Sequence, residues 1–131
     1  MAIELKILAL GALLLIIHIF TATRFKTAQY GRKWNMGARD EALPVPTSLT
    51  GRAIRAQANF EETFPVAIVA LLCVVIAHRT GATTRLGGWI WLGARVVYLP
   101  LYLAGIPVVR TMVFIISLVG LGMVLWPLLA G

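Results

Sequence analysis

Residues 51–65, Gly-Arg-Ala-Ile-Arg-Ala-Gln-Ala-Asn-Phe-Glu-Glu-Thr-Phe-Pro, lead directly into a long apolar run and decide how this chain folds. Within this stretch, spacings of three, four and three residues separate Arg52, Arg55, Asn59 and Glu62. On a helix these four side chains fall within roughly 80° of one another. The stretch therefore predicts a helix with one polar stripe at the mouth of a membrane segment. Basic, amide and acidic groups on one face suit a small zwitterionic ligand.

The composition indicates an integral membrane protein. The chain has 131 residues, of which 60% are hydrophobic and 13% charged, too apolar for a soluble domain. The net charge is +7, and the basic residues lie in the gaps between apolar runs. They are therefore a topology signal and do not indicate nucleic-acid binding. The single cysteine, Cys73, lies in an apolar run and is expected to be a buried, inert thiol. With two histidines far apart and no second thiol, no metal site is expected.

Four apolar segments predict an all-α, antiparallel bundle of four transmembrane helices in a single domain spanning residues 1–131. The helices are expected at about 2–21, 49–78, 86–103 and 106–129, with a basic loop at 24–48. The first segment is cleanly apolar only over 7–20, short for a span of about 20 residues, so a signal peptide is an alternative. Glu4 ahead of Lys6 weakens that alternative. Ser48 or Thr50 is expected to cap the second helix.

Basic residues predict the orientation of the bundle. Trp89 and Trp91 at the start of the third span and Trp126 at the end of the fourth are expected to form a belt at one interface. One end of the bundle carries only Lys6, Arg79 and Arg85. The other end, with the first and third loops, carries Arg24, Lys26, Arg32, Lys33, Arg39, Arg52, Arg55 and Arg110. The bias predicts that these two loops face the cytoplasm and that both termini lie outside.

The third span carries a charge about ten residues deep. Arg95, Tyr98 and Tyr102 lie at spacings of three and four and share one face. A buried arginine is expected to pair with a carboxylate, here Glu61 or Glu62, or to line a polar cavity. A structural ion pair and a ligand contact both remain open for Arg95.

Two further arginines are candidates for ligand contacts. Arg110 follows Pro107 in the first turn of the fourth span, where its charge adds to the positive end of the helix dipole and favours an anion site. Arg39, beside Asp40 in the basic loop, is the second candidate.

Two motifs resemble the MAPEG superfamily, the membrane-associated proteins of eicosanoid and glutathione metabolism. They are Arg-x-x-Arg-Ala-Gln-x-Asn-x-x-Glu-x-Phe-Pro at 52–65, and Ala-Arg-x-x-Tyr-x-x-x-Tyr at 94–102 followed by Arg110. The resemblance covers nearly the whole chain and is closer to the bacterial members. It implies a homotrimer in a bacterial inner membrane, with glutathione bound between neighbouring subunits near the cytoplasmic face.

The resemblance also implies roles for individual residues. Arg110 would stabilise the glutathione thiolate as the catalytic residue. Tyr98 and Tyr102 would contribute from the adjacent subunit. Thr63 and Ala104 replace a tyrosine and an arginine of the cysteinyl-leukotriene synthase, so eicosanoid specificity is not expected. The full set of expected glutathione-binding residues is Arg39, Arg52, Arg55, Gln57, Asn59, Glu62, Arg95, Tyr98 and Tyr102.

The expected function is glutathione transfer to a lipophilic electrophile, or glutathione-dependent reduction of a lipid hydroperoxide, with the substrate entering from the bilayer. A non-catalytic binding or scaffold protein of the same fold is one alternative. A small four-span transporter is another, disfavoured because the first helix has only Glu4, at its edge, as a membrane-embedded acid.

Overall fold

The computed structural model describes all of residues 1–131. The chain forms five helices: α1 (Ile3–Tyr30), α2 (Arg32–Met36), α3 (Ser48–Ile76), α4 (Ala82–Leu103) and α5 (Pro107–Leu129). Four of them, all except the short α2, are long and apolar enough to cross a membrane. This confirms the prediction of an all-helical protein with four long apolar helices.

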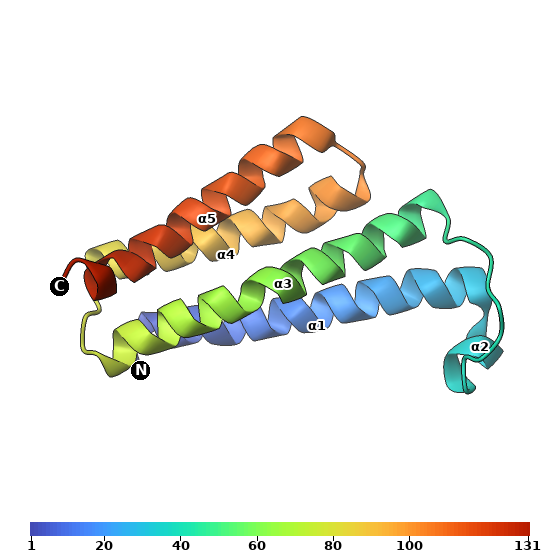
Figure 1. Cartoon of the computed structure of the whole chain (residues 1–131), viewed down its shortest axis with the longest axis horizontal. Coiled ribbons are helices and arrows are strands. Elements are labelled where there is room, and N and C mark those ends of the chain that lie inside the picture. The colour runs from blue at the N-terminus through green and yellow to red at the C-terminus, as the bar shows by residue number, and fades with distance from the viewer.

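The long helices run antiparallel as two hairpins. Figure 1 shows α1 beside α3 and α4 beside α5, with the N- and C-termini at the same end. The α3–α4 turn lies at this end as well, and Arg79 there donates to the Gly131 carbonyl at 3.0 Å. The α1–α3 loop and the α4–α5 turn therefore share the other end, as four antiparallel spans predicted.

The first helix is longer than predicted. It was expected to end near residue 21 but continues to Tyr30 and stops at Gly31, whose φ is 98°. Polar residues end an apolar span, but they do not end a helix. The helix ends at glycine, which readily takes a positive φ. At 1.5 Å per residue, 28 residues extend about 42 Å, beyond a hydrocarbon core of about 30 Å. The last turns of α1 therefore project past the apolar layer.

The other boundaries lie closer to expectation. Helix α4 begins at Ala82, four residues early, and α3 and α5 differ by one or two residues. The cap of α3 is Thr47 and neither Ser48 nor Thr50, because Thr47 is the last residue with a non-helical backbone, with ψ at 163°. Its hydroxyl accepts from the Thr50 N–H at 3.3 Å.

Three aromatic rings pack together within an otherwise aliphatic core. Phe64 stacks on Trp91 with centroids 6.0 Å apart and planes 2° apart, and Phe60 lies 5.1 Å from Phe64. Trp91 is therefore buried, which corrects its predicted place in an interfacial belt; Trp89 and Trp126 are exposed. Two residues along a helix turn the side chain by about 200°, so neighbouring tryptophans face opposite ways.

Two glycines let α4 and α5 touch. A Cβ added to Gly120 would lie 2.5 Å from the Gly87 carbonyl oxygen and 2.7 Å from the Trp91 nitrogen. Gly122 has nothing within 4 Å of the same position. Small residues at a crossing permit close backbone approach, so Gly120 holds the hairpin together and Gly122 does not.

Cys73 lies on the outer face of α3 and is exposed. The expectation of a buried thiol is therefore wrong. An apolar run shows that a segment lies in the membrane, but does not show which of its residues face other helices and which face lipid.

Candidate functional site

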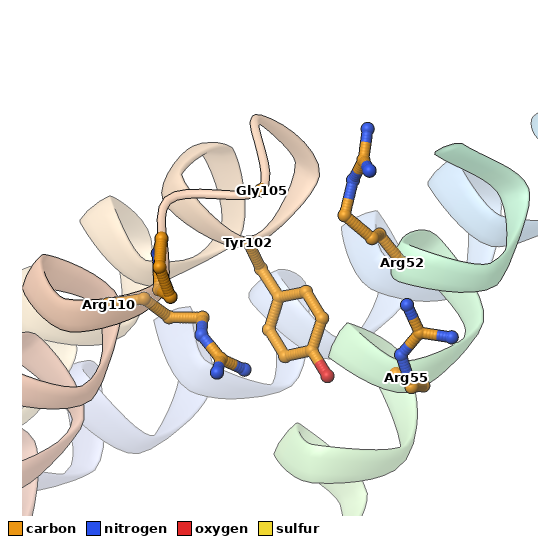
Figure 2. Close-up of a pocket in the computed structure, with 6 residues that line it drawn as sticks. Arg52, Arg55, Tyr102, Gly105 and Arg110 are labelled. Atoms are coloured by element: carbon orange, nitrogen blue, oxygen red, sulfur yellow. The ribbon is translucent and has the colours of Figure 1, made fainter. Parts of the chain in front are cut away.

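A pocket opens where α3, the end of α4 and the start of α5 meet. It has a volume of about 210 Å³, and no acidic side chain is among the residues that line it. Figure 2 shows the Tyr102 ring extending from α4 into the gap between Arg110 and Arg55. The lining residues are Arg52, Arg55, Tyr102, Gly105, Pro107 and Arg110.

The first turns of α3 place two of the arginines. The Nε of Arg52 donates to the Leu103 carbonyl at 2.8 Å, one of the carbonyls that the end of α4 leaves without a helical partner. Arg52 therefore connects α3 to α4 and keeps its Nη groups at the pocket. Arg55 is exposed, and its guanidinium lies back over Gly51, where an added Cβ would be 3.0 Å from its Nη1.

The α4–α5 turn places the third arginine. Gly105 has a φ of 74°, which favours glycine, and Pro107 begins α5. Arg110 follows within the first turns of α5, and its Cζ lies 4.5 Å from the centre of the Tyr102 ring. This cation–π contact holds the guanidinium beside the pocket. Three positive charges thus gather near a helix N-terminus, which also favours anions.

Arg95 and Tyr98 lie deeper and do not line the pocket. Tyr98 is buried and meets Tyr102 edge to face, with centroids 5.6 Å apart. Arg95 is fully buried, with its Cζ 4.3 Å from the Tyr98 ring and 5.2 Å from the Phe60 ring. A third ring, that of Phe114, lies 5.6 Å away.

The expected ion pair between Arg95 and Glu61 or Glu62 does not form. None of the three guanidinium nitrogens of Arg95 has a hydrogen-bond partner. Glu61 is exposed and instead accepts from Gln57 Nε2 at 2.9 Å, and Glu62 is exposed on α3. Both carboxylates are exposed, and the rings of Phe60, Tyr98 and Phe114 surround Arg95 in place of an acid.

The remaining predicted residues lie outside the pocket walls. Asn59 has a buried Oδ1 with no hydrogen-bond partner. Arg39 donates to the Asn35 carbonyl at 3.1 Å and lies 4.7 Å from the Trp34 ring, so it closes α2. The structure therefore brings together Arg52, Arg55, Tyr102 and Arg110. The other predicted residues do not line the pocket; they are Arg39, Gln57, Asn59, Glu62, Arg95 and Tyr98.

Sequence reasoning did not assign Gly105 and Pro107 to the site. The signal in the sequence was the Gly-Ile-Pro turn at 105–107. This turn directly precedes Arg110, so its backbone lies beside that side chain at the pocket. No group of three or more His, Cys, Asp or Glu side chains lies together in the structure.

Four long apolar helices with three arginines and a tyrosine converging at one end define a multi-pass membrane protein with a positively charged pocket. The chain belongs to the MAPEG family, whose model matches residues 7–130, and the resemblance in the two motifs is confirmed. No match was found among curated proteins or among solved structures. The family typically uses glutathione and includes glutathione transferases, peroxidases and non-catalytic members.

Proposed function

We propose that the protein is a membrane-bound glutathione-dependent transferase or lipid hydroperoxide peroxidase. Its pocket binds glutathione, and Arg110 keeps the glutathione sulfur ionised for attack on a lipophilic substrate. One observation carries the proposal: three guanidinium groups from α3 and α5 line one pocket that contains no carboxylate.

The charges of glutathione complement this pocket. The tripeptide carries two carboxylates, one ammonium group and a thiol, and gains a further negative charge when the thiol ionises. Arg52 and Arg55 are assigned to the carboxylates, and Arg110 to the sulfur. Lowering a thiol pKa from ~8.5 to ~6.5 requires about 2.7 kcal/mol. A single charge at ~4 Å contributes about 4 kcal/mol at an effective dielectric constant of ~20, so one arginine suffices.

The size of the pocket supports completion by a second subunit. Its volume of about 210 Å³ is below the roughly 300–1,000 Å³ typical of ligand sites. Glu62 is exposed on the outside of α3, and Gln57 is partly exposed there. We therefore propose a homotrimer in which a neighbouring chain closes the pocket, with Glu62 available for the ligand ammonium group. Tyr102 lines the pocket of its own chain. The excess of basic residues at this end supports a cytoplasmic orientation.

Both candidate reactions share the thiolate. In conjugation, the sulfur forms a bond to an electrophilic carbon, and the leaving group departs with its electron pair. In peroxide reduction, the sulfur attacks the terminal hydroperoxide oxygen, the O–O bond breaks and the alkoxide takes a proton. The resulting sulfenic acid then reacts with a second glutathione to give the disulfide and water. The protein contributes positioning and charge stabilisation to each.

The test is glutathione binding and turnover by detergent-purified protein. Calorimetry should show binding that Arg55→Gln weakens about tenfold, the value of one charge-assisted hydrogen bond. Arg85→Gln, an exposed arginine at the opposite end, is the control and should bind as wild type. Binding with turnover of a chloronitrobenzene or a fatty-acid hydroperoxide supports the enzyme. Binding without turnover of either substrate indicates a non-catalytic member, and absence of glutathione binding refutes the proposal.

A further inference from the structure

The last turns of α1 and the α1–α3 loop (residues 31–47) carry a concentration of positive charge that the proposed glutathione pocket does not use. Residues 24–47 hold five basic side chains and two acidic ones. Arg24, Arg32 and Lys33 are exposed, and no side-chain hydrogen bond engages them. Figure 1 shows α2 lying to the side of the α1 end, away from α3 in this view.

This loop is held in place on the bundle. Gln29 at the end of α1 donates to the Val45 carbonyl at 3.1 Å, and its Oε1 accepts from the Thr47 N–H at 2.9 Å. The Tyr30 hydroxyl donates to the Pro44 carbonyl at 2.9 Å. These bonds therefore fix residues 44–47, directly ahead of α3, to the end of α1.

Large apolar side chains are exposed on the same loop. Met36 in α2 is 88% exposed and Val45 is 86% exposed. Cations combined with exposed apolar groups, placed where a helix leaves the hydrocarbon layer, suit the interfacial region of a bilayer. A soluble polyanion offers nothing to Met36 and Val45, so the combination favours a phospholipid.

We propose that the exposed cations Arg24 in α1 and Arg32 and Lys33 in α2 bind the headgroup phosphates of anionic phospholipids in the surrounding bilayer. The bound lipid steadies the start of α3. Gln29 connects the loop to α3. Its side chain bonds both Val45 in the loop and Thr47, the N-cap of α3. Arg52 follows five residues later in the same helix, so lipid at the loop stabilises the helix turns that carry the pocket arginines. This inference does not depend on glutathione being the ligand.

The test titrates short-chain phosphatidylglycerol into the full-length protein in an uncharged detergent. Phosphatidylcholine and inorganic phosphate serve as comparisons. Bound lipid is counted by native mass spectrometry, and the thermal unfolding midpoint is followed in parallel. Each basic side chain near an anionic surface contributes about fivefold to binding, so Arg32→Gln/Lys33→Gln should bind phosphatidylglycerol roughly 25-fold more weakly. The matched control, Lys6→Gln/Arg85→Gln, removes two exposed charges from the opposite end and should bind as wild type.

Three results would overturn the assignment to the loop. They are wild-type binding by the Arg32→Gln/Lys33→Gln variant, equal stabilisation by inorganic phosphate, and loss of lipid binding in Arg52→Gln/Arg55→Gln instead. The last would place the lipid in the pocket.

Amide hydrogen exchange tests the coupling. Phosphatidylglycerol should slow exchange over residues 50–55 in wild type and much less in Gln29→Leu, with the bound lipid count unchanged. Equal protection in both proteins would refute the role of Gln29.

Discussion

Replacing Arg110 with alanine tests the central electrostatic argument. The guanidinium lies against Tyr102 at 4.5 Å and is one of three positive charges at the pocket. Arg52 and Arg55 remain in the variant, so glutathione affinity should change by less than tenfold. The thiolate loses its stabilising charge, and the pKa of the bound thiol should return from ~6.5 toward ~8.5. At pH 7 this change lowers the ionised fraction about 25-fold.

The direct assay is the ultraviolet absorbance of the thiolate during a pH titration of the glutathione complex. Because the positive charge favours the ionised form, wild type should stay ionised down to about pH 6.5, whereas Arg110→Ala should lose its signal below about pH 8.5. The turnover rate should fall by less than the ionised fraction, because a more basic thiolate is also more nucleophilic. Arg110→Lys keeps the charge and should fall between the two. Superimposable titrations of wild type and Arg110→Ala, with glutathione bound in both, would remove Arg110 from thiolate stabilisation.

Three further predictions concern the bundle, each measured by thermal unfolding in detergent. Gly120→Ala should destabilise the protein by about 1–3 kcal/mol because the added Cβ meets the backbone of α4. Gly122→Ala is the control and should be neutral or stabilising. Equal effects of the two changes would contradict the close approach of α4 and α5. Thr84→Val should lower stability by about 1–3 kcal/mol, since it removes the hydroxyl that donates to buried Glu4 at 2.6 Å. The matched change at the exposed neighbour, Thr83→Val, should have little effect. An unchanged stability of Thr84→Val would show that Glu4 needs no donor. Arg95→Met should leave stability unchanged or higher because the buried guanidinium nitrogens have no hydrogen-bond partner. Arg95→Ala should be destabilising because it leaves a cavity. Equal losses of stability in both variants would indicate that Arg95 is paired in the folded protein.

Hydropathy was sufficient to predict the four long helices, because apolar length is what a membrane requires. Helical periodicity also predicted that Arg52 and Arg55 share a face. The same periodicity placed Asn59 and Glu62 on that face, but neither lines the pocket of the single chain, so their contact with a ligand stays a prediction. Periodicity shows which side chains share a face, but the packing of neighbouring helices decides which part of that face stays open.

The surroundings of Arg95 were not readable from the sequence. A buried cation suggested an acid, and Glu61 and Glu62 were the candidates because the chain has only five acidic residues. The structure surrounds the guanidinium with rings from three helices, including Phe60 and Phe114. Such an enclosure depends on side chains far apart along the chain, and no local pattern predicts which rings will meet. The Gln29 contacts with Val45 and Thr47 escaped prediction for the same reason.

Arg52 serves two purposes with one side chain. At this end of the bundle, its bond to Leu103 is the one side-chain hydrogen bond between the α1–α3 hairpin and the α4–α5 hairpin. Because Nε makes that bond, a guest anion can take the Nη groups without separating the hairpins. Losing Arg52 would free the two hairpins to drift apart at the mouth of the site. A loss of ligand affinity in an Arg52 variant would then have two causes. One is the missing contact with the ligand, and the other is the altered spacing of α3 and α4 at the pocket.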